Sequence, residues 1–304
     1  MDPRLSVIIV TYNSENDIFY CLDSLFHYND LPPGALQVII VDNNSTHQAE
    51  LFNRIAQRYA GSVECVANPT NAGYGQGNNL GLRRARADVV LIVNPDVRFI
   101  MPMFKEVTAE FARRPGLSEY GMKQMLSPTK TSSNSFACTN MMNGYVATVL
   151  SALGTRLDWY WPRYMYFSGS CFFIRRQMFV DTGLFNEHVF MYGEEDYVHC
   201  RLGRRFGYHM HYNPHLRYIH LVGERKPDFA YERRVIDAVV TQGEYNNYPA
   251  GLTVLNRLRS TRLQLWRASL KALFRHVDPA LVAMLGEKRD YLKHRLNLSK
   301  SKHK

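Results

Sequence analysis

The feature that most restricts the fold of this sequence is a pattern that occurs four times in the first third of the chain. Each time, a short run of apolar, mostly β-branched residues ends in a polar turn, and a segment with apolar residues at helical spacing lies next to it in the sequence. This alternation predicts an α/β fold with a doubly wound, mostly parallel sheet flanked by helices. The four polar turns then lie at one edge of the sheet, where folds of this kind bind ligands. The predicted strands are residues 5–10, 36–41, 63–67 and 89–93, and a helix over residues 80–86 is predicted to lead into the last of them.

The fourth predicted strand ends in Asn94-Pro95-Asp96. Because proline cannot continue a central strand, the chain turns there and leaves Asp96 at the carboxyl end. A carboxylate with little else to neutralise it suits a hard divalent cation that carries phosphates. The alternative is an aspartate that only caps the following turn.

Two other turns offer candidate nucleotide contacts. Asp42 follows the second strand, where a carboxylate can accept hydrogen bonds from a nucleobase or a ribose. A turn or helix cap is an equally good interpretation of Asp42 and its neighbour Asn44. Gly73 and Gly75 permit close backbone approach to a phosphate, but their spacing fits neither GxGxxG nor the ATP phosphate loop. A glycine-rich loop without a ligand is the alternative.

Three carboxylates in succession, Glu194, Glu195 and Asp196, precede a predicted helix. A helix N-terminus stabilises acidic residues, which is one explanation of the run. Adjacent like charges also repel one another, which raises the pKa of one member and suits a general base. His220 follows the last predicted strand. A single histidine is more often structural, but near a metal and a diphosphate it could bind either.

Composition limits the partners and the compartment. The net charge of +10 suits a nucleic acid, an anionic membrane surface or a phosphorylated substrate. Five scattered cysteines without a CxxC pair predict neither a zinc site nor a disulfide framework, and they fit a reducing compartment. No signal peptide is visible, and the longest apolar run, residues 145–153, is too short to span a membrane. We therefore expect a cytoplasmic protein that rests peripherally on the inner face of the plasma membrane.

The second half of the chain divides into three parts. Residues 117–161 are irregular, which predicts a long loop or a small subdomain. Further strands and helices are expected up to residue 224, among them a last strand over residues 208–213, and residue 224 ends the predicted catalytic domain of residues 1–224. Residues 225–304 mix basic and apolar residues and predict a basic amphipathic helical extension with a disordered tail from Ser299. Its helices either pack on the main domain or lie on anionic lipid headgroups.

Taken together, these segments resemble the family 2 glycosyltransferases, in particular the rhamnosyltransferase-like branch that builds bacterial surface polysaccharides. The resemblance covers about residues 5–225. No single motif is specific to the family, but the set of motifs in this order is. The matching motifs are VIIVTYN at 7–13, VDNNS at 41–45, NPTNAGYGQGNN at 68–79, LIVNPD at 91–96, SGS at 168–170, GLFNE at 183–187, MYGEED at 191–196 and HLVG at 220–223.

The resemblance implies a GT-A fold and inverting transfer of rhamnose or another hexose. The donor would be a UDP- or dTDP-sugar and the acceptor a saccharide or a lipid-linked saccharide, in synthesis of a cell-surface polysaccharide such as O-antigen. Asp96 stands at the last position of the family's DxD motif for Mg²⁺ or Mn²⁺, with His220 as a further ligand. The implied nucleotide-sugar-binding residues are Thr11, Tyr12, Asn13, Asp42, Asn44, Asn71, Gly73, Gly75, Asn78 and Asn94.

The resemblance leaves two positions open for the catalytic base. In the family a Glu-Asp pair precedes an arginine that lies seven residues after the Glu. Counting back from Arg201 makes Glu194 the Glu and places Glu195 at the position of the base. The pair Glu195-Asp196 instead makes Asp196 the base, at a shorter spacing. We expect Glu195 to be the base, with Asp196 as the alternative.

Two other functions compete with sugar transfer. A nucleotidyltransferase needs a basic loop after the first strand, and residues 11–14 contain no lysine or arginine. A nucleic-acid-binding protein needs basic residues interleaved with aromatic residues on one face. Here the basic residues concentrate after Arg201, away from the expected site. We therefore expect no nucleic-acid partner.

Overall fold

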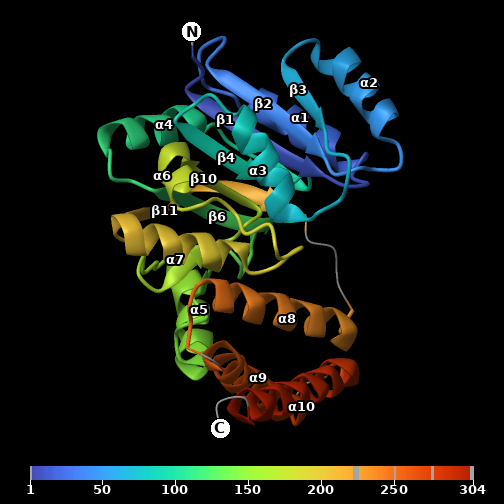
Figure 1. Cartoon of the computed structure of the whole chain (residues 1–304), viewed down its shortest axis with the longest axis vertical. Helices are drawn as coiled ribbons and strands as arrows, with labels where there is room; N and C mark the ends of the chain where they lie inside the picture. The colour runs from blue at the N-terminus through green and yellow to red at the C-terminus, as the bar shows by residue number, and fades with distance from the viewer. Residues whose placement is uncertain (1, 222–225, 250, 275–276, 302–304) are drawn as a thin grey trace. The chain divides into compact units, whose positions relative to one another are not determined.

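The structure is a computed structural model of the whole chain, and it describes residues 2–221, 226–249, 251–274 and 277–301 (Figure 1). The chain forms two compact units. The sheet unit consists of residues 1–135, 167–190 and 198–222, and the helical unit consists of residues 136–166, 191–197 and 223–304. The predicted domain boundary between residues 224 and 225 lies outside the described residues.

The first four predicted strands form the parallel half of the main sheet. They pair in the order β3-β2-β1-β4, with all pairs parallel. Thr11 and Asp42 are register partners, so the polar turns that follow β1 and β2 begin at the same level. This arrangement confirms the predicted βα alternation. The strands are β1 (Leu5–Thr11), β2 (Leu36–Asp42), β3 (Val63–Ala67) and β4 (Val89–Val93).

The other half of the sheet is mixed. Beside β4 the order continues β10-β6-β11-β5, in which only β6 and β11 pair in parallel. The α/β fold class is confirmed. Nine strands of the described residues form one mixed sheet, whose parallel part is the order β3-β2-β1-β4. The strands are β5 (Val97–Phe99), β6 (Glu119–Ser127), β7 (Lys130–Thr131), β10 (Cys171–Arg175) and β11 (Met210–His220); β8 (Phe136–Cys138) and β9 (Met165–Phe167) form a small separate sheet.

Helices flank this sheet, and fully buried apolar side chains from strands such as β1 and β4 form its core. Helix α3 begins at Tyr74, whereas the sequence pattern predicted a start at Leu80. The glycine-rich segment is therefore the first part of a helix and not a loop. The helices are α1 (Asp17–His27), α2 (Gln48–Tyr59), α3 (Tyr74–Arg84), α4 (Phe104–Arg113), α6 (Arg176–Asp181) and α7 (Glu194–Phe206), the last of which passes from the helical unit into the sheet unit.

The helical unit has a hydrophobic core of its own, formed by Ile236, Val240, Val254, Leu258 and Leu292. Helix α10 continues through Ser301, where we expected disorder from Ser299, and residues 302–304 lie outside the described residues. Among the described residues no helix is both long and apolar enough to cross a bilayer. The helices of this unit are α5 (Gly144–Leu157), α8 (Phe229–Tyr245), α9 (Leu252–Ala272) and α10 (Pro279–Ser301).

Residues 117–161 are more regular than their sequence suggested. They contain β6, the longer part of which is buried next to β10, and helix α5. The sequence of β6 shows no alternation of apolar and polar residues, because the strand is covered on both faces. Tyr120, Met122 and Gln124 are all buried, as are most of their neighbours. Strand β11 likewise extends beyond its predicted end at Asn213, because a register shift between Asn213 and Arg217 accommodates Pro214.

Candidate active site

The structure brings Asp96 and His220 together in the sheet unit. Val97 N donates to Asn94 O at 3.2 Å, and this turn presents Asp96 directly after β4. Strand β11 pairs antiparallel with β5, and His220 is the register partner of Val97. His220 Nε2 therefore lies 3.2 Å from Asp96 Oδ2, although the two residues are far apart in the sequence.

One oxygen of Asp96 is left for another ligand. Asp96 Oδ1 and His220 Nδ1 are buried and have no hydrogen-bond partner within the described part of the chain. A buried carboxylate oxygen without a donor fits a bound cation, since such an atom is otherwise costly. No group of three or more His, Cys, Asp or Glu side chains suited to a metal occurs among the described residues. Two protein ligands suffice where substrate phosphates and water complete the coordination, as is common for Mg²⁺.

The carboxylate of Asp42 is fully buried and saturated by protein donors. Its oxygens accept hydrogen bonds from Thr11 Oγ1 at 2.9 Å, Ser45 N at 2.8 Å, Ser45 Oγ at 2.6 Å and Gln48 Nε2 at 2.7 Å. The structure thus favours the turn-forming role of Asp42 that we considered beside a direct nucleotide contact. Ser45 and Gln48, the partners that produce this arrangement, are not among the predicted site residues.

The turn after β1 is tied to the turn after β2. Asn13 N donates to Ser45 Oγ at 2.8 Å, and Asn13 Oδ1 accepts from Thr46 N at 3.0 Å. Asn13 and Asn44 both have positive φ, at 49° and 62°, which asparagine tolerates better than most residues. Asn44 is exposed and the side chain of Tyr12 is 50% exposed, so these two predicted site residues are open to a ligand.

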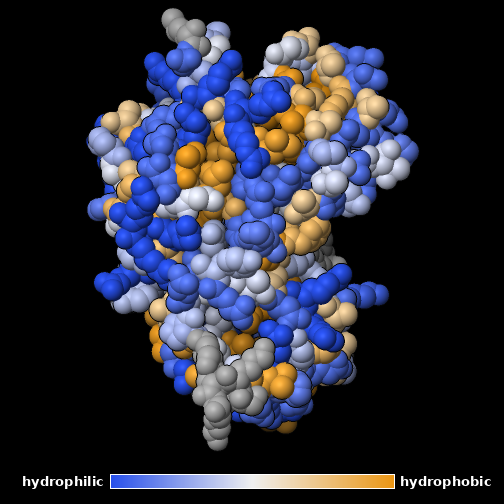
Figure 2. All heavy atoms as spheres, viewed as in Figure 1, coloured by the Kyte–Doolittle hydropathy of each residue, from blue (hydrophilic) through white to orange (hydrophobic). Residues whose placement is uncertain are grey.

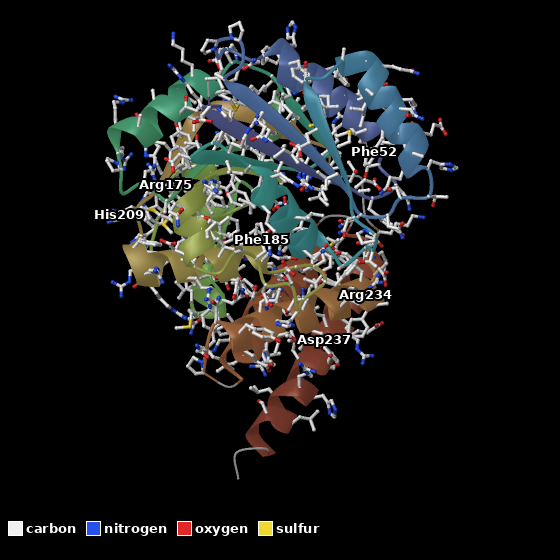
Figure 3. The ribbon with its side chains drawn as sticks, turned by 45° about the horizontal axis from the view of Figure 1, so that its top comes forward. Phe52, Arg175, Phe185, His209, Arg234 and Asp237 are labelled. Carbon is white, nitrogen blue, oxygen red and sulfur yellow. The ribbon has the colours of Figure 1, made fainter. Side chains whose placement is uncertain are left out.

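The glycines at the start of α3 are required by protein neighbours. Gly73 has φ +99°, and a Cβ there would lie 1.8 Å from Phe190 O. Tyr74 N donates to this same carbonyl at 3.0 Å. A Cβ on Gly75 would lie 3.0 Å from Cβ of Phe185, which lies beside α3 (Figure 3). The close backbone approach that we expected toward a phosphate is made here by the chain around Phe185 and Phe190.

A network of asparagine side chains holds the segment before α3. Asn43 Nδ2 donates to Gly73 O at 3.0 Å, and Asn43 Oδ1 accepts from Asn68 Nδ2 at 2.9 Å. Asn71 Oδ1 accepts from Gly73 N at 3.2 Å. Asn78 Nδ2 donates to Tyr74 O at 3.0 Å, and Asn78 Oδ1 is buried without a partner in the described structure. The repeated asparagines of the two motifs are the sequence signal for Asn43 and Asn68, which are not among the predicted site residues.

The Ser-Gly-Ser segment before β10 links α3 to the Asp96 turn. Gly169 O accepts from the Tyr74 hydroxyl at 2.7 Å, and Ser170 O accepts from Asn94 N at 2.9 Å. The predicted site residue Asn94 is thereby fixed through its backbone. Tyr74 and Ser170 support the site through these contacts, and neither was predicted to belong to it.

The three successive carboxylates belong to the helical unit, where they differ strongly in burial. Glu194 and Asp196 are 2% and 3% exposed, whereas Glu195 is partly exposed. Burial, assisted by the negative charge of Glu195, raises the pKa of Glu194 to about 8. Asp196 Oδ2 accepts hydrogen bonds from Asn140 Nδ2 at 2.7 Å and from the Tyr248 hydroxyl at 3.3 Å.

The chain that leads into these carboxylates has an unusual backbone. Tyr192 and Gly193 have φ values of +83° and +86° directly before α7. A positive φ is uncommon for a residue with a large side chain, and such positions cluster at functional sites. Burial raises the pKa of the nearby Tyr166 hydroxyl, and the negative charges of Asp196 and Glu195 add to this effect. Asn140 and Tyr248 thus donate hydrogen bonds to Asp196, and Tyr166 lies near both Asp196 and Glu195.

The comparison with known protein families identifies the family of this chain. Residues 6–183 match the family described as Glycosyl transferase family 2, which is more than half of the chain. The chain belongs to glycosyl transferase family 2. The family prediction from the ordered motifs is therefore confirmed, and membership favours glycosyl transfer over the nucleotidyltransferase and nucleic-acid-binding alternatives.

Curated proteins with similar sequences are named as glycosyltransferases. The low-salt glycan biosynthesis hexosyltransferase Agl10 of Haloferax volcanii is 27% identical over 204 residues, which are 63% of this chain and 59% of that protein. The poly(ribitol-phosphate) beta-glucosyltransferase of Bacillus spizizenii is 30% identical over 94 residues, or 31% of this chain. That alignment spans only 15% of the relative's length.

Solved structures of glycosyltransferases share the fold of this family 2 chain. The mannosyltransferase PcManGT from Pyrobaculum calidifontis, in complex with GDP-Man and Mn²⁺, matches with a TM-score of 0.60 and 18% identity over 99% of this chain and 87% of that chain. S. aureus TarS 1–349, in complex with UDP-GlcNAc, matches with a TM-score of 0.55 and 18% identity over 99% and 88%. At these identities the likeness establishes the fold, and the GT-A prediction is confirmed.

Proposed function

We propose that this family 2 glycosyltransferase moves a sugar from a nucleotide-diphosphate donor to a hydroxyl of a saccharide or lipid-linked saccharide. We assign it to cell-surface polysaccharide synthesis, with rhamnose from a UDP- or dTDP-donor as the first sugar to test and O-antigen as a candidate product. The observation that carries the proposal is the Asp96–His220 pair at the carboxyl edge of the parallel strands. A relative named as a glycan biosynthesis hexosyltransferase and one named as a poly(ribitol-phosphate) beta-glucosyltransferase support it.

Asp96 and His220 are the residues that we propose to hold Mg²⁺ or Mn²⁺. The buried Oδ1 of Asp96, which has no donor among the described residues, is the carboxylate oxygen that such an ion needs. A bound divalent ion supplies positive charge that neutralises the leaving diphosphate. PcManGT, which shares the fold, was solved in complex with both GDP-Man and Mn²⁺, and this supports the same use of a metal here.

We propose that the turns after β1 and β2 receive the nucleotide. Tyr12, Asn13 and Asn44 present exposed polar groups there. Thr11 and Asp42 are buried and bonded to each other, so their proposed role is to keep these turns in position. Asn71, Gly73, Gly75, Asn78 and Asn94 remain predicted contributors to nucleotide-sugar binding; of these, the buried Oδ1 of Asn78 is an acceptor that a ligand could satisfy.

We propose that Glu195 takes the proton from the acceptor hydroxyl as this oxygen attacks the anomeric carbon. The bond to the diphosphate breaks on the opposite face, so a single displacement inverts the configuration. Glu195 suits a general base better than its neighbours do, because Glu194 is buried with a pKa raised to about 8 and Asp196 already accepts hydrogen bonds from Asn140 and Tyr248. Asp196 stays the alternative base.

The test separates donor binding from transfer. Nucleotide-sugars are first screened, with Mg²⁺ and with Mn²⁺, for a rise in melting temperature of the wild-type protein, because a ligand that binds the folded state stabilises it. Asp96→Asn should abolish the metal-dependent shift and the transfer. Glu195→Gln should keep the shift and lower kcat by ~10²–10⁴, the usual contribution of a general base.

The matched control is Asp2→Asn, an exposed aspartate that precedes β1 and follows no strand. It should change neither the shift nor the transfer. An active Glu195→Gln together with an inactive Asp196→Asn moves the base by one residue. Absence of a shift with every nucleotide-sugar, or unchanged turnover of Asp96→Asn, contradicts the proposal.

A further inference from the structure

Helix α5 of the helical unit carries an apolar stripe that its own unit leaves exposed. Tyr145, Val149, Leu153 and Leu157 are spaced four residues apart, so they lie on one face of the helix. Their side chains are 41%, 38%, 45% and 68% exposed. The first three of these residues lie within residues 145–153, the longest apolar run of the sequence. Figure 2 shows hydrophobic atoms at the surface beside the position that α5 has in Figure 1.

Two tryptophans directly follow this helix. Trp159 and Trp161 are 42% and 43% exposed, and their ring centroids lie 5.8 Å apart. An exposed pair of indole rings is unusual on a surface that only meets water, since each ring has a large apolar area. Tryptophan is, however, enriched where a protein meets the interface of a bilayer, because its ring is apolar and its N–H is polar.

Helix α9 runs in the same direction as α5. A Cβ on Gly144 would lie 1.8 Å from Asn256 O, and Thr148 Oγ1 lies 2.8 Å from Ser260 Oγ. Two residues of α5 that are four positions apart therefore contact two residues of α9 that are also four positions apart, in the same order along both helices. The C-terminal parts of both helices consequently lie at the same end of the helix pair.

The C-terminal part of α9 is also apolar and exposed. Trp266, Leu270, Leu273 and Phe274 are 60%, 43%, 74% and 81% exposed. Together with Leu153, Leu157, Trp159 and Trp161 they form what we call the apolar end of the helical unit. Single exposed apolar residues are normal, but eight of them on the same end of two packed helices indicate an interaction surface.

The charges around the apolar end are mainly positive, although Asp158 lies between Leu157 and Trp159. Residues 252–274 contain five basic residues and no acidic residue. Arg262 and Lys271 are exposed, whereas Arg257 and Arg259 are half-buried. Arg259 also contacts Asn256 Oδ1 at 3.3 Å, so the residues available to a partner are mainly Arg262, Arg267 and Lys271.

We propose that the apolar end docks on an anionic lipid bilayer, with Trp159, Leu157 and Phe274 among the side chains that enter the interface. Exposed apolar side chains beside an excess of basic residues are the combination that such docking requires. A second copy of the chain fits less well, since a two-fold contact would place this positively charged surface against itself. The proposal rests on the proposed function, because a lipid-linked acceptor gives the enzyme a reason to work at a membrane.

The test measures sedimentation of the full chain with vesicles of phosphatidylcholine alone and of phosphatidylcholine and phosphatidylglycerol in equal parts. The wild type should sediment with the anionic vesicles only, and added salt should weaken this binding. Arg262→Gln with Lys271→Gln should weaken binding by about 25-fold, from about 1 kcal/mol for each basic residue near the surface. Leu157→Ser with Leu273→Ser and Phe274→Ser should reduce it by roughly tenfold or more.

The control variants are Tyr20→Ser and Lys105→Gln, which change an exposed aromatic and an exposed basic residue of the sheet unit. They should bind vesicles like the wild type. Melting curves and nucleotide-sugar shifts of all variants should match the wild type, which separates this proposal from the proposed function. Equal binding by the triple apolar variant and the wild type, equal sedimentation with both vesicle types, or a wild-type dimer that the triple variant loses would overturn the proposal.

Discussion

Glu194 is a carboxyl group that the folded chain keeps mostly protonated near neutral pH. Its side chain is buried, Oε1 has no hydrogen-bond partner in the described structure, and its pKa is raised from 4.5 to about 8. When Glu194 is neutral, Glu195 has one negatively charged neighbour, Asp196, where the sequence alone suggests two. The run of three acidic residues is thus compatible with burial because one member need not ionise.

Stability should therefore depend on pH through Glu194. Below pH 4.5 the carboxyl group is protonated in both states, so its contribution is fully present. Between pH 4.5 and about 8 the unfolded chain has released this proton and the folded chain has not, so the free energy of unfolding falls as pH rises. Glu194→Gln has no such proton to release. We therefore expect the stability of this variant relative to the wild type, measured by urea unfolding, to be higher at pH 8 than at pH 5.

Glu50→Gln is the matched control, because Glu50 lies exposed on α2. Its stability relative to the wild type should be nearly the same at both pH values. A Glu194→Gln variant that differs from the wild type by the same amount at pH 5 and pH 8 would show that Glu194 titrates as an ordinary glutamate.

At the scale of elements, the start of α3 depends on Gly73. Alanine there would have its Cβ 1.8 Å from Phe190 O in addition to a left-handed backbone. We expect Gly73→Ala to lower the free energy of unfolding by ~3 kcal/mol or more, since the backbone term alone costs about 1–2 kcal/mol. It should also weaken nucleotide-sugar binding, because the Tyr74 N–H bond to Phe190 holds this turn. Denaturant unfolding and ligand-induced melting shifts measure the two effects.

Gly61→Ala provides the control for the backbone term. Gly61 has φ +76°, but a Cβ at this position would meet no atom within 4 Å. The substitution should cost only the left-handed backbone energy and leave ligand binding intact. Equal destabilisation by the two alanines would mean that Phe190 moves away and that the contact does not matter.

The elements that the sequence predicted well are those with a simple pattern. The strands β1, β2 and β4 are short β-branched runs buried on both faces, whereas β3 is partly exposed at the end of the strand order. All four strands begin and end within a residue or so of their prediction. Helix α3 was predicted too short because its first turn consists of glycine and polar residues, and only the contacts with Phe185 and Phe190 explain why it is helical.

The site was predictable as a set of positions and less so as a set of roles. The Asp96–His220 proximity was expected from motif order, and the structure brings the two side chains together. The saturation of Asp42 could not be predicted, because it depends on Ser45 and Gln48 turning back onto the carboxylate. Likewise, the burial of Glu194 and Asp196 depends on contacts from distant parts of the chain, such as Tyr248.

At the scale of the whole molecule, the helical unit is held by a small core of its own. Leu292 of α10 is fully buried against residues of α8 and α9. Asp237 of α8, labelled in Figure 3, also accepts a hydrogen bond from the Tyr291 hydroxyl at 2.5 Å. These contacts join three successive helices, so the loss of one large apolar side chain should affect all three.

Leu292→Ala should lower the free energy of unfolding by ~2–5 kcal/mol, as large-to-small changes in a core do. Leu298→Ala, on the same helix but 48% exposed, should cost much less. Denaturant unfolding followed by circular dichroism measures both. If the two alanines are equally tolerated, the core described for this unit does not contribute to its stability.

Helix α7 begins in the helical unit and ends in the sheet unit, and the chain passes between the two units at several other points. Neither unit is therefore encoded by one uninterrupted stretch of the gene. A single recombination event therefore cannot exchange one unit for that of a relative while keeping the other unit intact. New specificities in such a protein should then arise by point substitutions and loop changes, with Glu194 to Tyr197 and the rest of α7 inherited together.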